Sequence, residues 1–267
     1  MFLLCLDVGN TRAHAGVLRD GKVLWQHAVP TAQASDPVHG LAPCFAELAR
    51  GPIAPTGISF CSVVPAATAA LMPLLDATGW PLFHLTWDKC EPLGLPIDYP
   101  HPAQIGQDRL ALAFGALAQY GAPAVVIDLG TAVTFDVLNQ RGAYAGGIIA
   151  PGLAIMTRYL HEQTALLPAL DPNDLLVSAG IGSSTIEAMK IGCATGFAGM
   201  IRAILDRLLE ELRKRGEGHA RIVATGGSAG QLPRAWLGEI HFDPDLLMRG
   251  LEEAWKRNAK CKMQNAK

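Results

Sequence analysis

The spacing of apolar residues predicts strands and helices in a similar order in both halves of the chain. In the first half, apolar runs separated by turn residues predict three consecutive strands between residues 3 and 29, the third at 22–29. The elements expected after them are a helix at 36–50, a strand at 57–64, a helix at 66–78 and a strand at 81–86. Ser35 or Asp36 is the expected cap of the first helix, and Pro73 is expected to interrupt or kink the second.

The second half begins in the same way. Three strands, two helices, a strand and a final helix are expected at 124–129, 132–138, 144–150, 153–166, 183–215, 221–225 and 245–260. A proline-rich stretch at 91–102 cannot form regular structure and precedes an apolar helix at 104–120. The order β-β-β-α-β-α-β is the one that a ribonuclease H-like lobe shows. We therefore expect an α/β protein of two duplicated ribonuclease H-like lobes, each a mixed sheet flanked by helices, at 1–120 and 121–267.

Both halves share one strand ending, Asp-X-Gly followed by a hydroxyl or amide side chain. The segment DVGNTRAHAGVLRDG begins at Asp7, and DLGTAVTFDVLNQRG begins 121 residues later at Asp128. Glycine lets the backbone turn sharply near a ligand, and backbone amides with Thr11 or Thr131 could donate to phosphate oxygens. Because a bare carboxylate repels phosphate, Asp7 fits such a site only beside a cation such as hydrated Mg²⁺. One Asp-X-Gly is also an ordinary hairpin turn, but two copies in register favour a phosphate-binding turn used twice.

Composition narrows the class of protein. The 267 residues are 50% hydrophobic and carry a formal net charge of −2, so they offer no basic surface for nucleic acid. Six cysteines without a C-x-x-C pair indicate reduced thiols rather than disulfides or zinc ligands. Without a basic leader or an apolar run of membrane-spanning length, we expect a soluble cytoplasmic protein that binds neither membrane nor nucleic acid.

The segment YPHPAQIGQDR at 99–109 combines an aromatic ring, a proline-shaped loop and an Asp-Arg pair at the start of a helix. A helix N-terminus favours anions, and Arg109 could form a bidentate pair with a carboxylate or phosphate. Asp108 is placed to accept a proton from a hydroxyl. An Asp and an Arg in a first helical turn also occur as a surface ion pair, and the residues alone leave both interpretations open.

Two glycine-rich connections are weaker signals. GGIIAPG at 146–152 joins a strand to a helix, and ATGGSAG at 224–230 follows a strand. Either could shape a nucleotide- or substrate-facing loop or serve as a simple turn. The chain contains no G-x-x-x-x-G-K-[ST] loop, no G-x-G-x-x-G before the first helix and no G-x-S-x-G elbow, which argues against the chemistries of those motifs.

In order and in combination, these segments resemble the type III pantothenate kinase family of the acetate and sugar kinase, Hsp70 and actin superfamily. The residues that carry the resemblance are DVGNT at 7–11, SVVP at 62–65, Tyr99, GQDR at 106–109, DLGTAVTFD at 128–136, GGIIAPG at 146–152 and ATGG at 224–227. The resemblance implies ATP-dependent phosphorylation of pantothenate to 4′-phosphopantothenate, the first step toward coenzyme A.

The resemblance also implies roles for individual residues. Asp108 would be the general base, Thr131 would contact ATP, and Asp128 would bind a monovalent cation, K⁺ or NH₄⁺. The first ATP phosphate loop, in which Asp7 organises Mg²⁺ through water, would comprise Asp7, Val8, Gly9, Asn10, Thr11, Arg12, Ala13 and His14. Pantothenate, in a pocket at the interface of a homodimer, would contact Tyr99, Gly106, Gln107, Asp108, Arg109 and Thr185.

The chain departs from the family pattern at a few positions, and two rival functions stay open. Arg12 and His14 stand where small polar residues are frequent, and Gln107 replaces the alanine common in G-x-D-R. Ser183 or Ser184 could share the role of Thr185. The rivals are a small-molecule kinase or phosphatase of the same superfamily with a different acceptor, and a nucleotide-binding regulatory protein. The intact Asp-Arg pair argues against the second.

Overall fold

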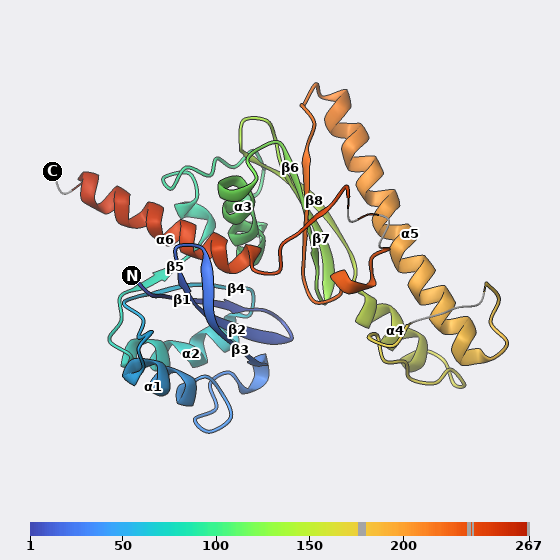
Figure 1. Cartoon of the computed structure of the whole chain (residues 1–267), viewed down its shortest axis with the longest axis horizontal. Helices are drawn as coiled ribbons and strands as arrows, with labels where there is room; N and C mark the ends of the chain where they lie inside the picture. Colours follow the sequence, from blue (N-terminus) through green and yellow to red (C-terminus); the bar gives the residue numbers. More distant parts are fainter. Residues whose placement is uncertain (176–179, 234–235, 237, 266–267) are drawn as a thin grey trace. The chain divides into compact units, whose positions relative to one another are not determined.

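The computed structural model describes residues 1–175, 180–233, 236 and 238–265 and divides into two compact units (Figure 1). Unit 1 comprises Met1–Gly121, Gly142–Ala145 and Asp245–Lys267, and unit 2 comprises Ala122–Arg141 and Gly146–Pro244. The sequence predicts a single boundary between the two lobes, after residue 120. The main break lies beside that position, but the last helix belongs to unit 1 because it packs on the sheet of unit 1.

Unit 1 is built on a five-stranded sheet of order β3-β2-β1-β4-β5. Its strands are β1 (Leu3–Val8), β2 (Arg12–Arg19), β3 (Lys22–Pro30), β4 (Ile58–Ser62) and β5 (Leu82–His84). β1 pairs antiparallel with β2 and parallel with β4, which pairs parallel with β5. The carboxyl ends of β1, β4 and β5 therefore meet at one edge of the sheet, where Asp7 lies opposite Cys61.

Helices cover both faces of this sheet (Figure 1). On one face, α1 (Ala42–Arg50) and α2 (Pro65–Ala77) pack on alternate apolar residues of β1, β2 and β4. On the other face, α3 (Gln107–Gln119) and α6 (Leu246–Asn265) pack on each other and on β1 and β4. Two glycines allow this close crossing, since a side-chain carbon at Gly250 would lie 1.8 Å from the carbonyl oxygen of Ala111 and one at Gly115 2.4 Å from that of Leu246.

Polar contacts also hold α6 to unit 1. The backbone N–H of Gly21, in the β2–β3 turn, donates to Glu252 Oε2 at 2.8 Å. Arg249 Nε donates to the carbonyl oxygen of the same glycine at 3.0 Å. Both partners lie more than 200 residues from the turn in sequence, so local pattern could not predict this association.

α3 begins three residues after its predicted start, and α6 ends five residues after its predicted end. α1 and α2 also differ from the prediction. α1 begins at Ala42 rather than Asp36, because Asp36 Oδ1 accepts the N–H groups of Val38 and His39 at 2.8 and 2.7 Å and forms a turn. α2 is continuous from Pro65 to Ala77 and contains Pro73. The five strands of this unit follow the predicted order.

The sheet of unit 2 has the strand order β10-β9-β6-β7-β8. This order repeats that of unit 1 when the sheet of unit 1 is read from β5 to β3. Its strands are β6 (Ala124–Leu129), β7 (Ala132–Leu138), β8 (Tyr144–Pro151, which begins in unit 1), β9 (Arg221–Thr225) and β10 (His241–Phe242). β6 pairs antiparallel with β7 and parallel with β9, which pairs parallel with β10. This confirms the predicted duplication. β10 was not predicted, because its two residues are both exposed and show no apolar alternation.

Among its described residues, unit 2 also contains the helices α4 (Leu153–Glu162) and α5 (Thr185–Lys214). α4 ends four residues before the predicted end. α5 buries one residue in every four along much of its length, at Met189, Cys193, Phe197, Ile201 and Leu205. An 18-residue window of α5 has a mean hydropathy of 1.3 and is only 28% buried. The prediction that no segment reaches membrane-spanning length is therefore wrong by length and composition, although one such helix is weak evidence of a span.

Candidate functional site

The first Asp-X-Gly turn closes the carboxyl end of β1 in unit 1. Gly9 N–H donates to the carbonyl oxygen of Arg12 at 3.1 Å and closes the turn. Thr31 supports the turn from outside, since its hydroxyl donates to the carbonyl oxygen of Gly9 at 2.6 Å and its N–H to that of Thr11 at 3.0 Å. The side chains of Val8 and Ala13 are buried in the core. Of the predicted ATP loop, these two residues could therefore contact a ligand only through their backbones.

The buried thiol of Cys61 is close to two of the candidate acids, Asp7 and Asp108. Cys61 Sγ donates to Asp7 Oδ1 at 3.4 Å. Burial raises the pKa of the Cys61 thiol well above its ordinary value, and the nearby carboxylates of Asp7 and Asp108 raise it further. The thiol is therefore a neutral donor, and both carboxylates are close enough to act on it. Sequence reasoning missed Cys61, because a cysteine inside an apolar strand looks like an ordinary core residue.

Asp108 is the second residue of α3, two positions after the cap residue Gly106. Its Oδ1 accepts the backbone N–H of Arg109 at 2.8 Å. Desolvation raises the pKa of Asp108, although the N–H and the guanidinium of Arg109 act in the opposite direction. A carboxylate with a raised pKa is suited to accept a proton near neutral pH.

Arg109 and Tyr99 both contact a second aromatic residue, Tyr144. The guanidinium carbon of Arg109 lies 5.9 Å from the centroid of the Tyr144 ring, and Tyr99 packs edge-on against the same ring at 6.3 Å. The proline-rich segment is held to the start of β8, since Tyr144 N–H donates to Pro96 O at 2.9 Å and Asp98 N–H to Tyr144 O at 2.8 Å. This pairing places Tyr99 near Arg109. Sequence reasoning missed Tyr144, whose only signal is an apolar strand position.

Gln107 joins the ends of β4 and β5. Its Oε1 accepts the backbone N–H of Ser62 at 2.8 Å and lies 2.7 Å from His84 Nε2. Because a backbone N–H can only donate, the atom facing Ser62 must be the carboxamide oxygen, and His84 Nε2 must carry a hydrogen. Desolvation lowers the pKa of His84, so the ring is neutral at pH 7. The carboxamide oxygen of Gln107 is therefore already engaged within unit 1.

In unit 2, the two glycine-rich segments meet the second Asp-X-Gly turn. Gly152 N–H donates to the carbonyl oxygen of Thr131 at 3.1 Å, and a side-chain carbon at Gly152 would lie 2.2 Å from that oxygen. Gly226 has a φ of 95°, and a side-chain carbon there would lie 2.6 Å from Asp128 Oδ1. GGIIAPG and ATGGSAG, which are weak signals individually, therefore surround the turn of Asp128 and Thr131.

Thr185 is the first residue of α5 and is exposed. The two preceding serines form a capping box: Ser184 Oγ accepts Glu187 N–H at 3.2 Å, and Ser183 donates through its N–H and hydroxyl to Glu187 Oε2 at 2.8 and 2.5 Å. This use of their hydroxyls favours Thr185 as the residue available for a ligand. Thr185 lines an apolar cavity of about 800 Å³ between α4 and α5, together with Ile155, Met156, Tyr159 and Met189.

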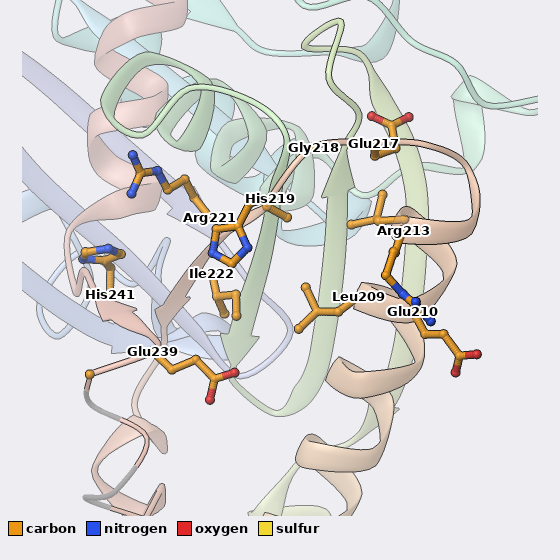
Figure 2. Close-up of a pocket in the computed structure, with 13 residues that line it drawn as sticks. Leu209, Glu210, Arg213, Glu217, Gly218, His219, Arg221, Ile222, Glu239 and His241 are labelled. Carbon is orange, nitrogen blue, oxygen red and sulfur yellow. The ribbon is translucent and has the colours of Figure 1, made fainter.

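A second cavity of unit 2, of about 870 Å³, lies between the end of α5 and strands β9 and β10 (Figure 2). Its polar side chains come from both sides and include Arg213, His219, Arg221 and Glu239. None of the residues that line it is among those predicted for catalysis or ligand binding. This cavity is therefore separate from the candidate site.

The carboxylate oxygens of the two Asp-X-Gly turns are suitable ligands for cations. Asp7 and Asp128 each present a partly buried carboxylate at the end of a strand. Mg²⁺ is usually bound through one or two carboxylates together with water and substrate phosphates. Among the described residues, no group of three or more His, Cys, Asp or Glu side chains could hold a metal ion.

Comparison with solved structures shows the fold. A putative Baf family transcriptional activator from Campylobacter jejuni has a TM-score of 0.58 at 19% identity and covers 96% of this chain and 99% of its own. A ROK hexokinase from Thermus thermophilus has a TM-score of 0.53 at 16% identity, with 95% and 98% covered. The chain thus has the actin-like ATPase fold predicted from its duplicated lobes.

Comparison of sequences shows the family. The family model described as type III pantothenate kinase matches residues 3–207. A type III pantothenate kinase from Akkermansia muciniphila is 48% identical over 194 residues, which cover 73% of this chain and 76% of that protein. The chain belongs to the type III pantothenate kinase family.

Proposed function

We propose that the chain transfers the γ-phosphoryl group of ATP to the primary hydroxyl of pantothenate in the cytoplasm, giving 4′-phosphopantothenate, the first step of coenzyme A biosynthesis. Family membership supports the reaction and its two substrates. The single observation that carries the mechanism is the environment of Asp108, a desolvated carboxylate held by Arg109 N–H beside the buried thiol that donates to Asp7.

Asp108 acts as the general base. One of its oxygens is held by Arg109 N–H at 2.8 Å, and the other would take the proton of the attacking hydroxyl. Removal of that proton contributes about 10²- to 10⁴-fold in typical enzymes. Pantothenate also carries a carboxylate, which suits the guanidinium of Arg109. The remaining contacts to pantothenate come from Tyr99, Gly106 and Thr185, and from the backbone of Gln107.

The two Asp-X-Gly turns serve ATP. Backbone N–H groups of the loop from Asp7 to His14 donate to phosphate oxygens, and Thr131 also contacts the nucleotide. Asp7 would hold Mg²⁺ through water, and Asp128 would hold K⁺ or NH₄⁺. Bound cations neutralise charge on the phosphates, which together with alignment is most of what phosphoryl transfer requires. The support for Asp128 is the close approach of Gly226 to its carboxylate.

The active form is a homodimer whose interface includes the exposed apolar surface of α4 and α5. Tyr159, which lines the apolar cavity together with Thr185, is 63% exposed, and Ile186, the residue after Thr185, is 48% exposed. A large exposed apolar surface of this kind marks an interaction site. Tyr159→Glu combined with Ile186→Asp should give a monomer by light scattering, whereas Val38→Asp, at an exposed apolar position of unit 1, should not. A dimer that survives the double substitution would contradict this assignment.

The experiment that tests the function is pantothenate-dependent release of ADP, measured with and without K⁺ or NH₄⁺. Asp108→Asn should lower kcat by about 10²- to 10⁴-fold with ATP binding retained, whereas the exposed Asp76→Asn should match the wild type. Near-normal turnover of Asp108→Asn would remove Asp108 from the role of base. Activity on sugars but not pantothenate would favour a kinase with another acceptor, and ATP binding without transfer to any acceptor would favour a regulatory protein.

A further inference from the structure

The first backbone N–H groups of a helix have no hydrogen-bond partner within the helix, so the start of α3 must be held by other groups. The side chain of a Ser, Thr, Asp or Asn at the cap position usually accepts such a hydrogen bond. Here the cap residue is Gly106, which has no side chain to do so. The next residue, Gln107, is the one that connects the helix start to the rest of unit 1.

Both lone pairs of the Gln107 carboxamide oxygen are occupied. One accepts Ser62 N–H at the carboxyl end of β4, and the other accepts His84 Nε2–H at the carboxyl end of β5. The His84 ring is itself held in place, since it stacks on Phe60 with centroids 4.1 Å apart and planes 14° apart. In addition, Lys89 Nζ donates to the carbonyl oxygen of His84 at 2.6 Å. The two donors are thus fixed by the sheet and not by the helix.

We propose that Gln107 is a positioning residue for Asp108, because it ties the first turn of α3 to the ends of β4 and β5 through Ser62 and His84. Asp108 follows Gln107 directly in the chain, so a shift of the helix start would carry the carboxylate with it. A displacement of about 1 Å at a reacting group can cost about 10²-fold in rate. This inference rests on the proposed role of Asp108 as the base.

Three variants separate positioning from a contact with substrate. Gln107→Met keeps the length of the side chain but removes the acceptor, and Gln107→Glu keeps acceptor oxygens. His84→Phe keeps a ring to stack on Phe60 but removes the Nε2 donor. Steady-state rates would be measured against pantothenate and ATP at pH 8, and amide hydrogen exchange would be followed at Ser62.

We call the contacts of Gln107 with Ser62 and His84 the tether. If the tether positions Asp108, its removal should lower kcat rather than weaken substrate binding. Gln107→Met should lower kcat by about 10- to 100-fold with both KM values changed by less than about threefold. Gln107→Glu should recover kcat to within about threefold of the wild type, and adding His84→Phe to Gln107→Met should cause no further loss, since both remove the same contact. Exchange of the Ser62 amide should be faster in Gln107→Met, a readout that does not depend on activity.

Other outcomes would overturn the inference. A KM for pantothenate raised tenfold with unchanged kcat would assign Gln107 to substrate binding. A lower melting temperature with unchanged kcat would make its role purely structural. If Gln107→Met fails to fold, a wild-type kcat in His84→Phe would still refute the proposal, because His84 provides one of the two contacts that hold Gln107. Failure of the proposed function would look different. In that case the wild-type chain would not phosphorylate pantothenate, but exchange of the Ser62 amide would still depend on Gln107. That result would refute the proposed function and the positioning of a base, but not the contacts of Gln107 with the strand ends.

Discussion

Gly106→Ala should separate the geometry of the base from the stability of the fold. Gly106 has a φ of −57°, which alanine adopts without strain. The added methyl carbon would, however, lie 2.4 Å from Asp108 Oδ1, whereas ordinary contacts are at 3.4 Å or more. Because this oxygen ends a flexible side chain, the carboxylate would move away by about 1 Å and lose its hydrogen bond from Arg109 N–H.

The expected effect on the rate follows from that displacement. A misplacement of about 1 Å corresponds to about 10²-fold in kcat, or about 2.7 kcal/mol of activation free energy. The free energy of unfolding should change by less than about 1 kcal/mol, since neither the backbone nor the core is disturbed. The loss should therefore appear in kcat, with ATP affinity retained.

The assay compares ADP release at saturating substrates with urea unfolding of the same preparations. Gly199→Ala, in the middle of α5 with nothing within 4 Å of the added carbon, is the matched control. It should keep the wild-type kcat and gain about 0.4–1 kcal/mol of stability. Wild-type kcat in Gly106→Ala would show that the position of the Asp108 carboxylate does not limit the reaction and would refute the reasoning.

Three further predictions concern the same two turns and the base. Gly152→Ala places a carbon 2.2 Å from the carbonyl oxygen of Thr131, a backbone atom that cannot move aside easily, so urea unfolding should show a loss of about 3 kcal/mol or more. The raised pKa of Asp108 means that its stabilising contribution is present below pH 3.8 and is lost as the pH rises through the folded-state pKa. Asp108→Asn should therefore melt at a higher temperature than the wild type at pH 7, with the advantage gone below pH 3.8; a lower melting temperature at pH 7 would contradict the desolvation argument. Cys61→Ala removes the donor to Asp7 and should raise the Mg²⁺ concentration needed for half-maximal activity, whereas Cys61→Ser should not; equal effects of the two would mean that Cys61 acts through packing alone.

Local pattern was sufficient for much of the architecture. Nine of the ten strands in the described part of the chain are predicted, because each has either apolar alternation or a buried run bounded by turn residues. The duplicated Asp-X-Gly segments also predict the repeated sheet order, since the same strand, turn and strand start both units. The exceptions have local causes that pattern does not resolve: Asp36 makes a turn instead of a cap, and β10 has no buried residue.

The surroundings of the candidate site depended on tertiary structure. The type and spacing of residues in YPHPAQIGQDR pointed to Asp108 and Arg109, but nothing in that segment indicates that Gln107 binds strand ends 45 and 23 residues away. Cys61, Tyr144 and Gly226 take part only because strand register and crossovers bring them to Asp7, Arg109 and Asp128.

The sequence alone thus determined the secondary structure, the duplication and the family, because side-chain periodicity and turn chemistry are local properties of the chain. The association of α6 with unit 1, the tether at Gln107 and the enclosure of Asp128 were decided by the folded structure. Those features depend on close packing and hydrogen bonds between distant segments, and such contacts exist only once the sheets have formed.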